Sequence, residues 1–391
     1  MPATLPMRGA PMPRQRGVGL IEVMVGILIG MIVVLVIFNT LVVAETYKRS
    51  TIGVSDAQIT GQLTQFVLNR ELANGGNGIM AGLSELAGCN NWRLRPMPAL
   101  ITDGGSAIAS DAVTVFYSNS PTIVHPAHFG AAGAAGTPYP VISPNGFKVG
   151  DWVIATQIAN LATFTVPTDC TLVQVTGITQ HPSLAAYPPA DLGGRVALSY
   201  LLQAGTAFNF TTASRAVNLG PRMTRTLYSV NAAKQQLDSL DDNPDAVVAT
   251  AVPVAQNVVL MKVQYGIDAD GDPLGLVDCW TSADNSNTCA NGIDYSDTTF
   301  QAVPAPLTTS QRIRSIKAIR IAIVVRSDDD VKQDTASGSL RDQTATLFSC
   351  PASIVRCSTV TIPANTVLQD YRRYRIYEAT IPLRNSLWHP L

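Results

Sequence analysis

The longest apolar stretch of the chain lies near its N-terminus, where residues 18–44 contain one charged side chain, Glu22. A run of more than about 18 apolar residues is long enough to span a bilayer as a helix. No proline follows until Pro96, and Gly75 and Gly76 form a stop signal. We therefore predict one continuous helix over residues 18–74, with a membrane-embedded half at about 18–44.

The second half of this predicted helix is amphipathic. Its apolar positions recur at helical spacing on one stripe, at Ile52, Ile59, Leu63, Phe66 and Val67. We predict that this half of the helix packs against the chain's own globular domain.

Gly26 and Gly30 form a small-xxx-small pair in the first half of the helix. Such a pair lets two membrane helices approach closely, and we name it as a helix-packing candidate. The alternative is that it reflects the ordinary glycine content of membrane helices.

Beyond the helix the pattern changes to short strand-like runs separated by turn residues. These runs are residues 113–117, 148–157, 170–180, 195–202, 224–231 and 258–268. Residues 120–146 are rich in Pro, Gly and Ala, and 238–244 are polar, so both are expected to be loops. We predict an α+β fold, with a long N-terminal transmembrane/amphipathic helix before a mostly antiparallel β-rich domain at 77–391. A loop-rich inserted region is expected at about 77–250.

Two later segments also have strand character. Residues 315–327 place Ile319, Ile321 and Ile323 on one face and Arg320 and Arg326 on the other, which predicts a half-buried strand. Residues 371–383 carry several arginines and tyrosines. We expect a solvated face there, with a contact surface for another protein or for an anionic polymer as the alternative.

The residues before the apolar run form a basic leader, with Arg8, Arg14, Arg16 and no acid, ending in Gly17. A cleavable secretory signal has an apolar region of only about 7–15 residues, so this run is too long for one. A carboxylate in hydrocarbon costs at least about 2.5 kcal/mol and usually has a function and a partner. The basic leader, Gly17 and the spacing to Glu22 together resemble the class III signal of type IV prepilins and their pseudopilin relatives.

That resemblance implies that residues 1–17 are a leader. A prepilin peptidase would cut between Gly17 and Val18 and methylate the new N-terminus at Val18. Glu22 would become the fifth mature residue and would pair with the Val18 ammonium of a neighbouring subunit. Such a pair also sets the axial register between subunits, because a slip leaves both charges unpaired.

A second resemblance lies in the C-terminal part. The segments QNVVLMKVQYGIDADGDP, SIKAIRIAIVVRS and RRYRIYEATIPLRN are similar to the C-terminal half of PilW-type minor pilins. The resemblance implies a minor pilin acting in pilus assembly, in priming or at the tip. Its partners would be other minor and major pilins, the prepilin peptidase and the inner-membrane assembly machinery. It would sit in the bacterial cytoplasmic membrane with its C-terminal domain in the periplasm, and then in the filament.

Two alternatives remain open on the sequence. One is a minor pseudopilin of a type II secretion system, which carries the same signal. The other is a membrane-anchored binding module or adhesin that does not polymerise.

The chain has six cysteines, and an exported protein is expected to form disulfides. Six cysteines allow 15 pairings, and unpaired buried thiols are the alternative. Two local pairs stand out and leave one further pair; the three are Cys279 with Cys289, Cys350 with Cys357, and Cys89 with Cys170. No pair has C-x-x-C spacing, which argues against zinc.

Asp268, Asp270 and Asp272 alternate beside a glycine, and alternating carboxylates can wrap a hard cation such as Ca²⁺. The twelfth position from Asp268 is Cys279 and not glutamate, so an EF-hand is excluded and an acidic turn is the alternative. His125 and His128 have no evident third ligand and are expected at the surface. No catalytic motif is present, so we expect no enzyme and no other cofactor. The formal net charge of -1 gives no direct evidence for a nucleic-acid partner.

Overall fold

The computed structural model describes residues 17, 19–120, 125–142, 146–157, 169–180, 196–244, 250–271, 275–284, 289, 293–302, 306–327, 344–350, 356–363 and 373–387. The chain divides into two compact units, residues 1–53 and 54–391. Leader residues 1–16, Val18 and Asp272 lie outside the described residues.

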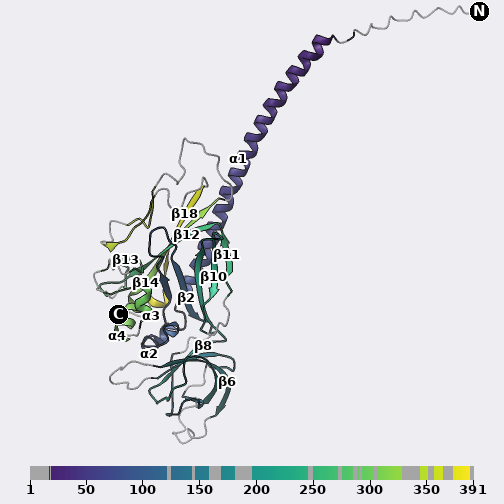
Figure 1. Ribbon diagram of the computed structural model, residues 1–391. Coiled ribbons are helices and arrows are strands. Elements are labelled where there is room, and N and C mark those ends of the chain that lie inside the picture. The colour runs from purple at the N-terminus through teal and green to yellow at the C-terminus, as the bar shows by residue number, and fades with distance from the viewer. Residues whose placement is uncertain are drawn as a thin grey trace, which may run out of the picture. The chain divides into compact units, whose positions relative to one another are not determined.

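One long helix, α1 (Leu20–Asn74), begins in the first unit and ends in the second (Figure 1). This confirms the prediction of one continuous helix. The observed helix begins at Leu20, two residues later than predicted. Its first half is apolar on all faces, and these side chains are exposed. Among the described residues, α1 is the one helix that is long and apolar enough to cross a membrane.

The second unit contains two five-stranded sheets. The first has the order β1-β2-β9-β10-β11 and is antiparallel throughout. Its strands are β1 (Ala99–Thr102), β2 (Ala112–Ser118), β9 (Met223–Asn231), β10 (Gln236–Asp241) and β11 (Val252–Gln256). The prediction of a polar loop at 238–244 is therefore wrong for residues 238–241. These residues belong to β10, which pairs with β9 on one side and β11 on the other.

The second five-stranded sheet has the order β16-β13-β12-β14-β18, and all its pairs are antiparallel except β13 with β16. Its strands are β12 (Val258–Ile267), β13 (Cys279–Thr281), β14 (Ile316–Arg326), β16 (Arg356–Cys357) and β18 (Tyr374–Pro382). A separate antiparallel pair is formed by β15 (Ala345–Leu347) and β17 (Val360–Ile362).

The main core joins these two sheets to the second half of α1. Side chains from all three elements contribute, among them Leu68, Leu72, Val113, Val263 and Ile321. Apolar side chains buried on the facing sides of the sheets supply the hydrophobic driving force for this arrangement.

Strand β14 is buried on both faces, so the prediction of a half-buried strand is wrong. The second face holds Arg320, whose guanidinium lies between the rings of Trp280 and Phe348, at 4.8 and 4.6 Å from their centroids. Arg320 Nε also donates to Gln264 Oε1 at 2.7 Å. The strand can bury this face because its charged group is stacked and hydrogen-bonded.

A six-stranded sheet is inserted between β2 and β9 and has the order β3-β8-β5-β6-β7-β4. Its strands are β3 (Ala127–His128), β4 (Tyr139–Val141), β5 (Trp152–Thr156), β6 (Cys170–Gln180), β7 (Val196–Ala204) and β8 (Arg215–Gly220). A bridge between Phe129 and Val141 joins the two edges and closes the sheet into a barrel with its own apolar core. Ser118 and Met223, which flank the insertion, are paired neighbours.

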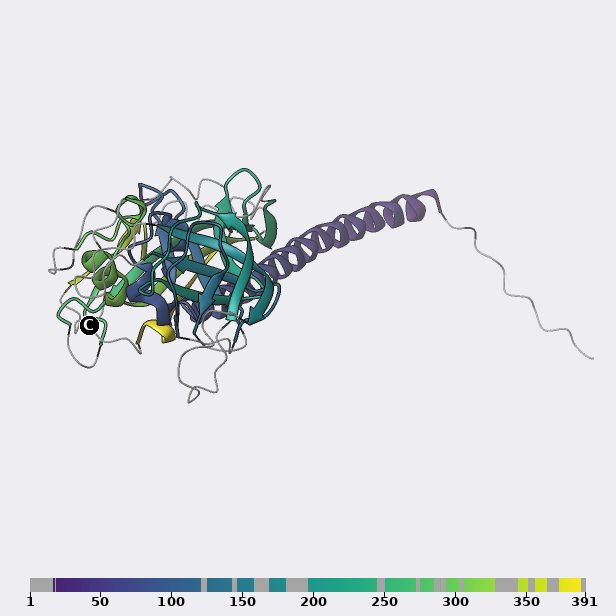
Figure 2. The same cartoon turned by 90° about the horizontal axis from the view of Figure 1, so that it is seen from below.

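Figure 1 shows the barrel strands β6 and β8 in teal at one end of the second unit, and Figure 2 looks onto that end. The insertion expected at about 77–250 is thus narrower than predicted. Its described residues form six paired strands, because long-range pairing orders segments whose local pattern is weak. Two strands, β3 and β4, lie within the supposed linker 120–146.

The remaining helices are short. They are η1 (Met80–Gly82), α2 (Leu83–Leu86), η2 (Trp92–Leu94), α3 (Asp297–Gln301), α4 (Pro306–Ser315) and α5 (Arg384–Leu387). Leu86 of α2 and Leu94 of η2, together with Ile79 just before η1, pack with outward-facing barrel residues such as Trp152 and Ile154 in a further apolar cluster. This cluster attaches the barrel to the rest of the unit.

Candidate functional site

The first turn of α1 carries the signal glutamate. The helix begins at Leu20, and Gly19 O accepts the Glu22 amide at 2.9 Å, which places the carboxylate in the first turn. The positive end of the helix dipole favours a negative charge at that place. Among the described residues, no ion pair includes Glu22. Its pairing with the Val18 ammonium of a neighbouring subunit stays a prediction.

Gly17, Gly26 and Gly30 lie in open space. A Cβ atom added at any of the three would meet nothing within 4 Å. Glycine is therefore not required there by the chain's own fold, and the predicted role of Gly26 and Gly30 in packing between helices stays a prediction.

The second half of α1 packs against its own domain through one face, which has small residues near Tyr377 and two leucines closer to the end of the helix. The buried positions are Ala57, Gly61, Thr64, Leu68 and Leu72. They follow each other at three or four residues and so form one face.

Tyr377 on β18 makes the closest contact with this face. A Cβ atom at Gly61 would lie 2.0 Å from Tyr377 Cε2, so the ring lies directly against the helix backbone. Tyr377 Oη donates to Ala57 O at 3.4 Å, and Gln65 Nε2 donates to Glu378 O at 3.0 Å. The sequence analysis missed this contact, and the spacing of Ala57 and Gly61 is the signal that could have indicated it.

The large apolar side chains of the same helix segment point the other way. Ile59, Leu63 and Phe66 are 60%, 53% and 64% exposed, and Ile52 is exposed as well. The second half of the helix therefore packs against its own domain as predicted, but the apolar stripe does not form the packing face. Small residues lie opposite Tyr377 because they let the helix backbone approach its ring, which bulky side chains would prevent.

Polar contacts hold the end of the helix. Tyr117 Oη on β2 donates to Glu71 Oε2 at 2.8 Å, and Asn385 Nδ2 donates to Gly75 O at 3.0 Å. Burial, with the Glu71 carboxylate beside it, raises the pKa of Tyr117 to about 12. The phenol therefore stays a proton donor at physiological pH.

The structure joins the six cysteines in the three pairs that the spacing suggested. Cys89–Cys170, Cys279–Cys289 and Cys350–Cys357 have Cα–Cα distances of 5.4, 5.7 and 5.7 Å. The first links the segment after α2 to strand β6 of the barrel. The other two are local.

In the acidic turn that starts at Asp268, the first carboxylate makes contacts within the chain itself. Asp268 is buried, its Oδ1 accepts the Gly271 amide at 2.8 Å, and its Oδ2 lies 3.8 Å from Lys317 Nζ. Asp270 is exposed, and Asp272 lies outside the described residues. Within the described part of the chain, no three His, Cys, Asp or Glu side chains gather as metal ligands do. Calcium binding at this turn stays a prediction.

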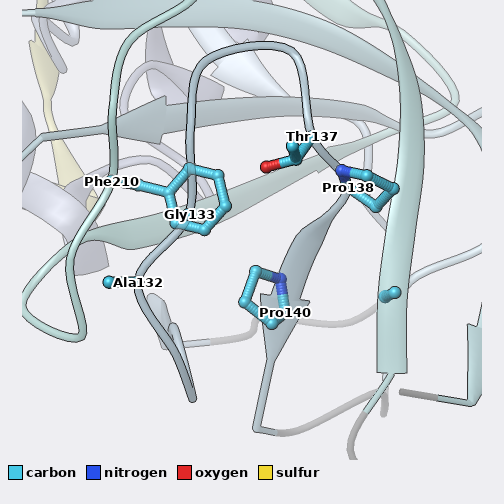
Figure 3. Close-up of a pocket in the computed structure, with 7 residues that line it drawn as sticks. Ala132, Gly133, Thr137, Pro138, Pro140 and Phe210 are labelled. Carbon is cyan, nitrogen blue, oxygen red and sulfur yellow. The ribbon is translucent and has the colours of Figure 1, made fainter. Parts of the chain in front are cut away.

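The barrel carries a small pocket at one end, lined by Ala132, Gly133, Thr137, Pro138, Pro140, Ala197 and Phe210. The Phe210 ring lies against Gly133 (Figure 3), where a Cβ atom would come within 2.2 Å of it. This lining offers one hydroxyl and no ionisable group, so it supplies neither acid–base chemistry nor a metal site. His125 and His128 are exposed, and partial burial beside Arg215 lowers the pKa of His128.

Two family models match this chain. The model described as Type IV Pilus-assembly protein W matches residues 218–385, and the Prokaryotic N-terminal methylation motif matches residues 12–38. The two matches support a type IV pilus-related, pilin-like protein whose C-terminal part is similar to the PilW family. The PilW-type region runs from β8 to α5 and contains the whole sheet β16-β13-β12-β14-β18. Strands β3–β7 of the barrel lie outside both matches.

Neither the comparison with curated proteins nor that with solved structures finds a match. The matched family is a structural component of pilus assembly. The apolar helix and the class III signal fit a membrane-anchored pilin. Together the two matches imply a type IV pilus system, whose pilins and prepilin peptidase are the expected partners of this chain.

Proposed function

We propose that this chain is a minor pilin of a type IV pilus, a structural subunit that acts in assembly or priming or at the filament tip. The peptidase cuts between Gly17 and Val18 and methylates Val18. The new chain waits in the cytoplasmic membrane through the first half of α1, with its β-rich domain in the periplasm. It then enters the filament, where α1 is the polymerising element.

The observation that supports this most strongly is Glu22 in the first turn of an otherwise apolar helix. A carboxylate within an apolar helix bundle is costly unless a cation accompanies it. The N-terminus created by cleavage at Gly17 supplies such a cation in every subunit. Glu22, five residues after Gly17, thus links the signal, the cleavage step and assembly.

The size of the second unit supports a priming or tip position. The inserted barrel adds a complete core beside the PilW-type region. A domain enlarged in this way obstructs the close repetition that a filament shaft requires, whereas a terminal position leaves room for it.

Glu22→Ala tests the proposal, with Glu45→Ala as its matched control. Glu45 is an exposed carboxylate on the same helix, paired with Arg49 at 3.2 Å. We expect the Glu22→Ala chain to reach the membrane but to be lost from sheared filaments, and the Glu45→Ala chain to be incorporated normally. The measurement is the amount of the chain in filament and membrane fractions.

Normal incorporation of the Glu22→Ala chain would contradict the proposed role of Glu22. A wild-type chain that functions in the membrane and never enters filaments would support an anchored binding module or adhesin. Dependence on secretion genes in place of pilus genes would support a pseudopilin.

A further inference from the structure

One buried arginine of the second unit lacks a partner for its charge. Arg312 of α4 is 7% exposed, and its Nε is buried without a hydrogen-bond partner. Its guanidinium makes no ion pair with another described residue. Hydrogen bonds or ion pairs hold the other six buried cations of the described part of the chain, which are Arg95, Arg215, Arg225, Lys262, Lys317 and Arg320. Because a buried charge without a partner is costly, Arg312 is the exception that indicates a missing anion.

A second guanidinium lies close to Arg312. Arg312 stacks on the ring of Phe300 in α3, with its Cζ 5.3 Å from the ring centroid, and the two helices lie together in Figure 1. Arg95 binds the end of the same helix, where it donates to Phe300 O and, at 2.9 Å, to Ala302 O. Burial, and then the charge of Arg312, lower the pKa of Arg95 to about 10, which still leaves it charged at neutral pH. Two like charges therefore meet at one place.

The nearby carboxylate of Asp294 does not balance both charges. It acts on Arg312 electrostatically, but no ion pair joins the two among the described residues. Its Oδ1 accepts the Ser296 amide at 2.9 Å, and its Oδ2 accepts the hydroxyls of Ser296, at 3.1 Å, and Thr299. Two guanidinium groups and one occupied carboxylate leave an excess positive charge, which a second carboxylate would neutralise.

The site lies at the end of the second unit where α1 ends. Ile316 follows α4 directly, and its carbonyl accepts Ser386 Oγ at 2.6 Å. The adjacent Asn385 donates to Gly75 O at 3.0 Å, just after α1. Val54, the first residue of α1 in this unit, is about 30 Å from Gly75 along the helix. The apolar half of α1 precedes Val54, so the anion is expected from a protein and not from a phospholipid headgroup.

We propose that Arg312 binds an aspartate or glutamate side chain of a neighbouring protein subunit that contacts this end of the chain. Stacking on Phe300 leaves the edge of the guanidinium free, and that edge matches a carboxylate with two parallel hydrogen bonds. Gln311 beside Arg312 and Gln301 beside Phe300 are exposed, so the site opens at the surface. This proposal rests on the proposed function and identifies a contact through which the subunit joins its neighbours.

Arg312→Met tests the proposal, with Arg314→Met as the matched control. Arg314 is a half-buried arginine two positions later, on the other side of the same helix. We expect Arg312→Met to reduce the amount of the chain in sheared filaments several-fold and Arg314→Met to leave it unchanged. Methionine keeps the packing on Phe300 and removes the repulsion of Arg95, so the purified full-length Arg312→Met chain should unfold at the same or a higher temperature than wild type.

A lower unfolding temperature of Arg312→Met would indicate a merely structural role and overturn the proposal. Normal incorporation of this variant, or equal losses in both variants, would overturn it as well.

Photo-crosslinking and charge exchange identify the partner carboxylate. The photoreactive analogue p-benzoylphenylalanine replaces Gln311 in the full chain, and the crosslinked peptide is sequenced by mass spectrometry. We expect a peptide from another filament subunit that contains aspartate or glutamate. Arg312→Glu should then lose incorporation, and lysine at the partner's acidic position should restore it. Crosslinks to phospholipid, a peptide without an acidic residue, or no restoration would each contradict the proposal.

The proposed function and the site fail differently. A wild-type chain that has its mature N-terminus and enters filaments, together with an Arg312→Met chain that enters equally well, overturns the site alone. A wild-type chain that keeps its leader and stays out of filaments overturns the proposed function and the site with it.

Discussion

Gly61 is the residue on which close docking of the helix depends most directly. Its missing side chain leaves room for the Tyr377 ring, and the same ring reaches Ala57 O through its hydroxyl. Tyr377 and Glu378 lie on β18, an edge strand of the PilW-type sheet. A single small residue therefore allows the long helix α1 to lie directly against the edge of the sheet.

Gly61→Ala should destabilise the second unit by about 2 kcal/mol, because the added methyl group overpacks the contact. In a Tyr377→Ala background the same change should be nearly neutral, since the ring that it meets is gone. Thermal unfolding of the four chains measures both effects. Equal destabilisation in the two backgrounds would show that Gly61 matters for another reason.

Arg320 explains why the alternating pattern of β14 wrongly predicted a half-buried strand. An arginine at alternate positions with isoleucines indicates a solvent-facing side. Here the arginine is buried between two rings and bonded to Gln264, and burial lowers its pKa to about 10, which still leaves it charged at neutral pH. The rings come from β13 and from the residue after β15, and no local pattern could indicate that they meet.

At the scale of elements, the strongest periodic signals were predicted well. The continuous helix and the strand at residues 170–180 follow from unbroken apolar or alternating patterns. The packing face of the helix was not predicted, because glycine, alanine and threonine add little hydrophobicity and yet allow the closest approach. The barrel was missed because its first and last strands pair across residues far apart in the chain.

The barrel and the rest of its unit are joined by the Cys89–Cys170 disulfide, which spans 81 residues, whereas Cys350–Cys357 spans 7. In the chain-entropy model, a disulfide that closes a longer loop stabilises the folded state more. The model gives about 4 kcal/mol for Cys89–Cys170 and about 2 kcal/mol for Cys350–Cys357. Serine replacement of the first pair should therefore lower the urea midpoint more than replacement of the second. A larger effect from the short loop would contradict an entropic origin.

At the scale of the whole molecule, the chain combines a signal, a helix and a β-rich unit with different tasks. In the proposed function, the signal and Glu22 serve processing and register. The second half of the helix packs on its own domain. The β-rich unit supplies the PilW-type sheet and the inserted barrel. The account holds together only if the chain is processed as a prepilin.

Mass spectrometry of the N-terminal peptide, from membranes and from sheared filaments, tests that claim most directly. The account predicts a mature chain that begins at N-methylated Val18 in the filament fraction. An intact leader, or cleavage near Ala44 that releases the domain, would contradict it.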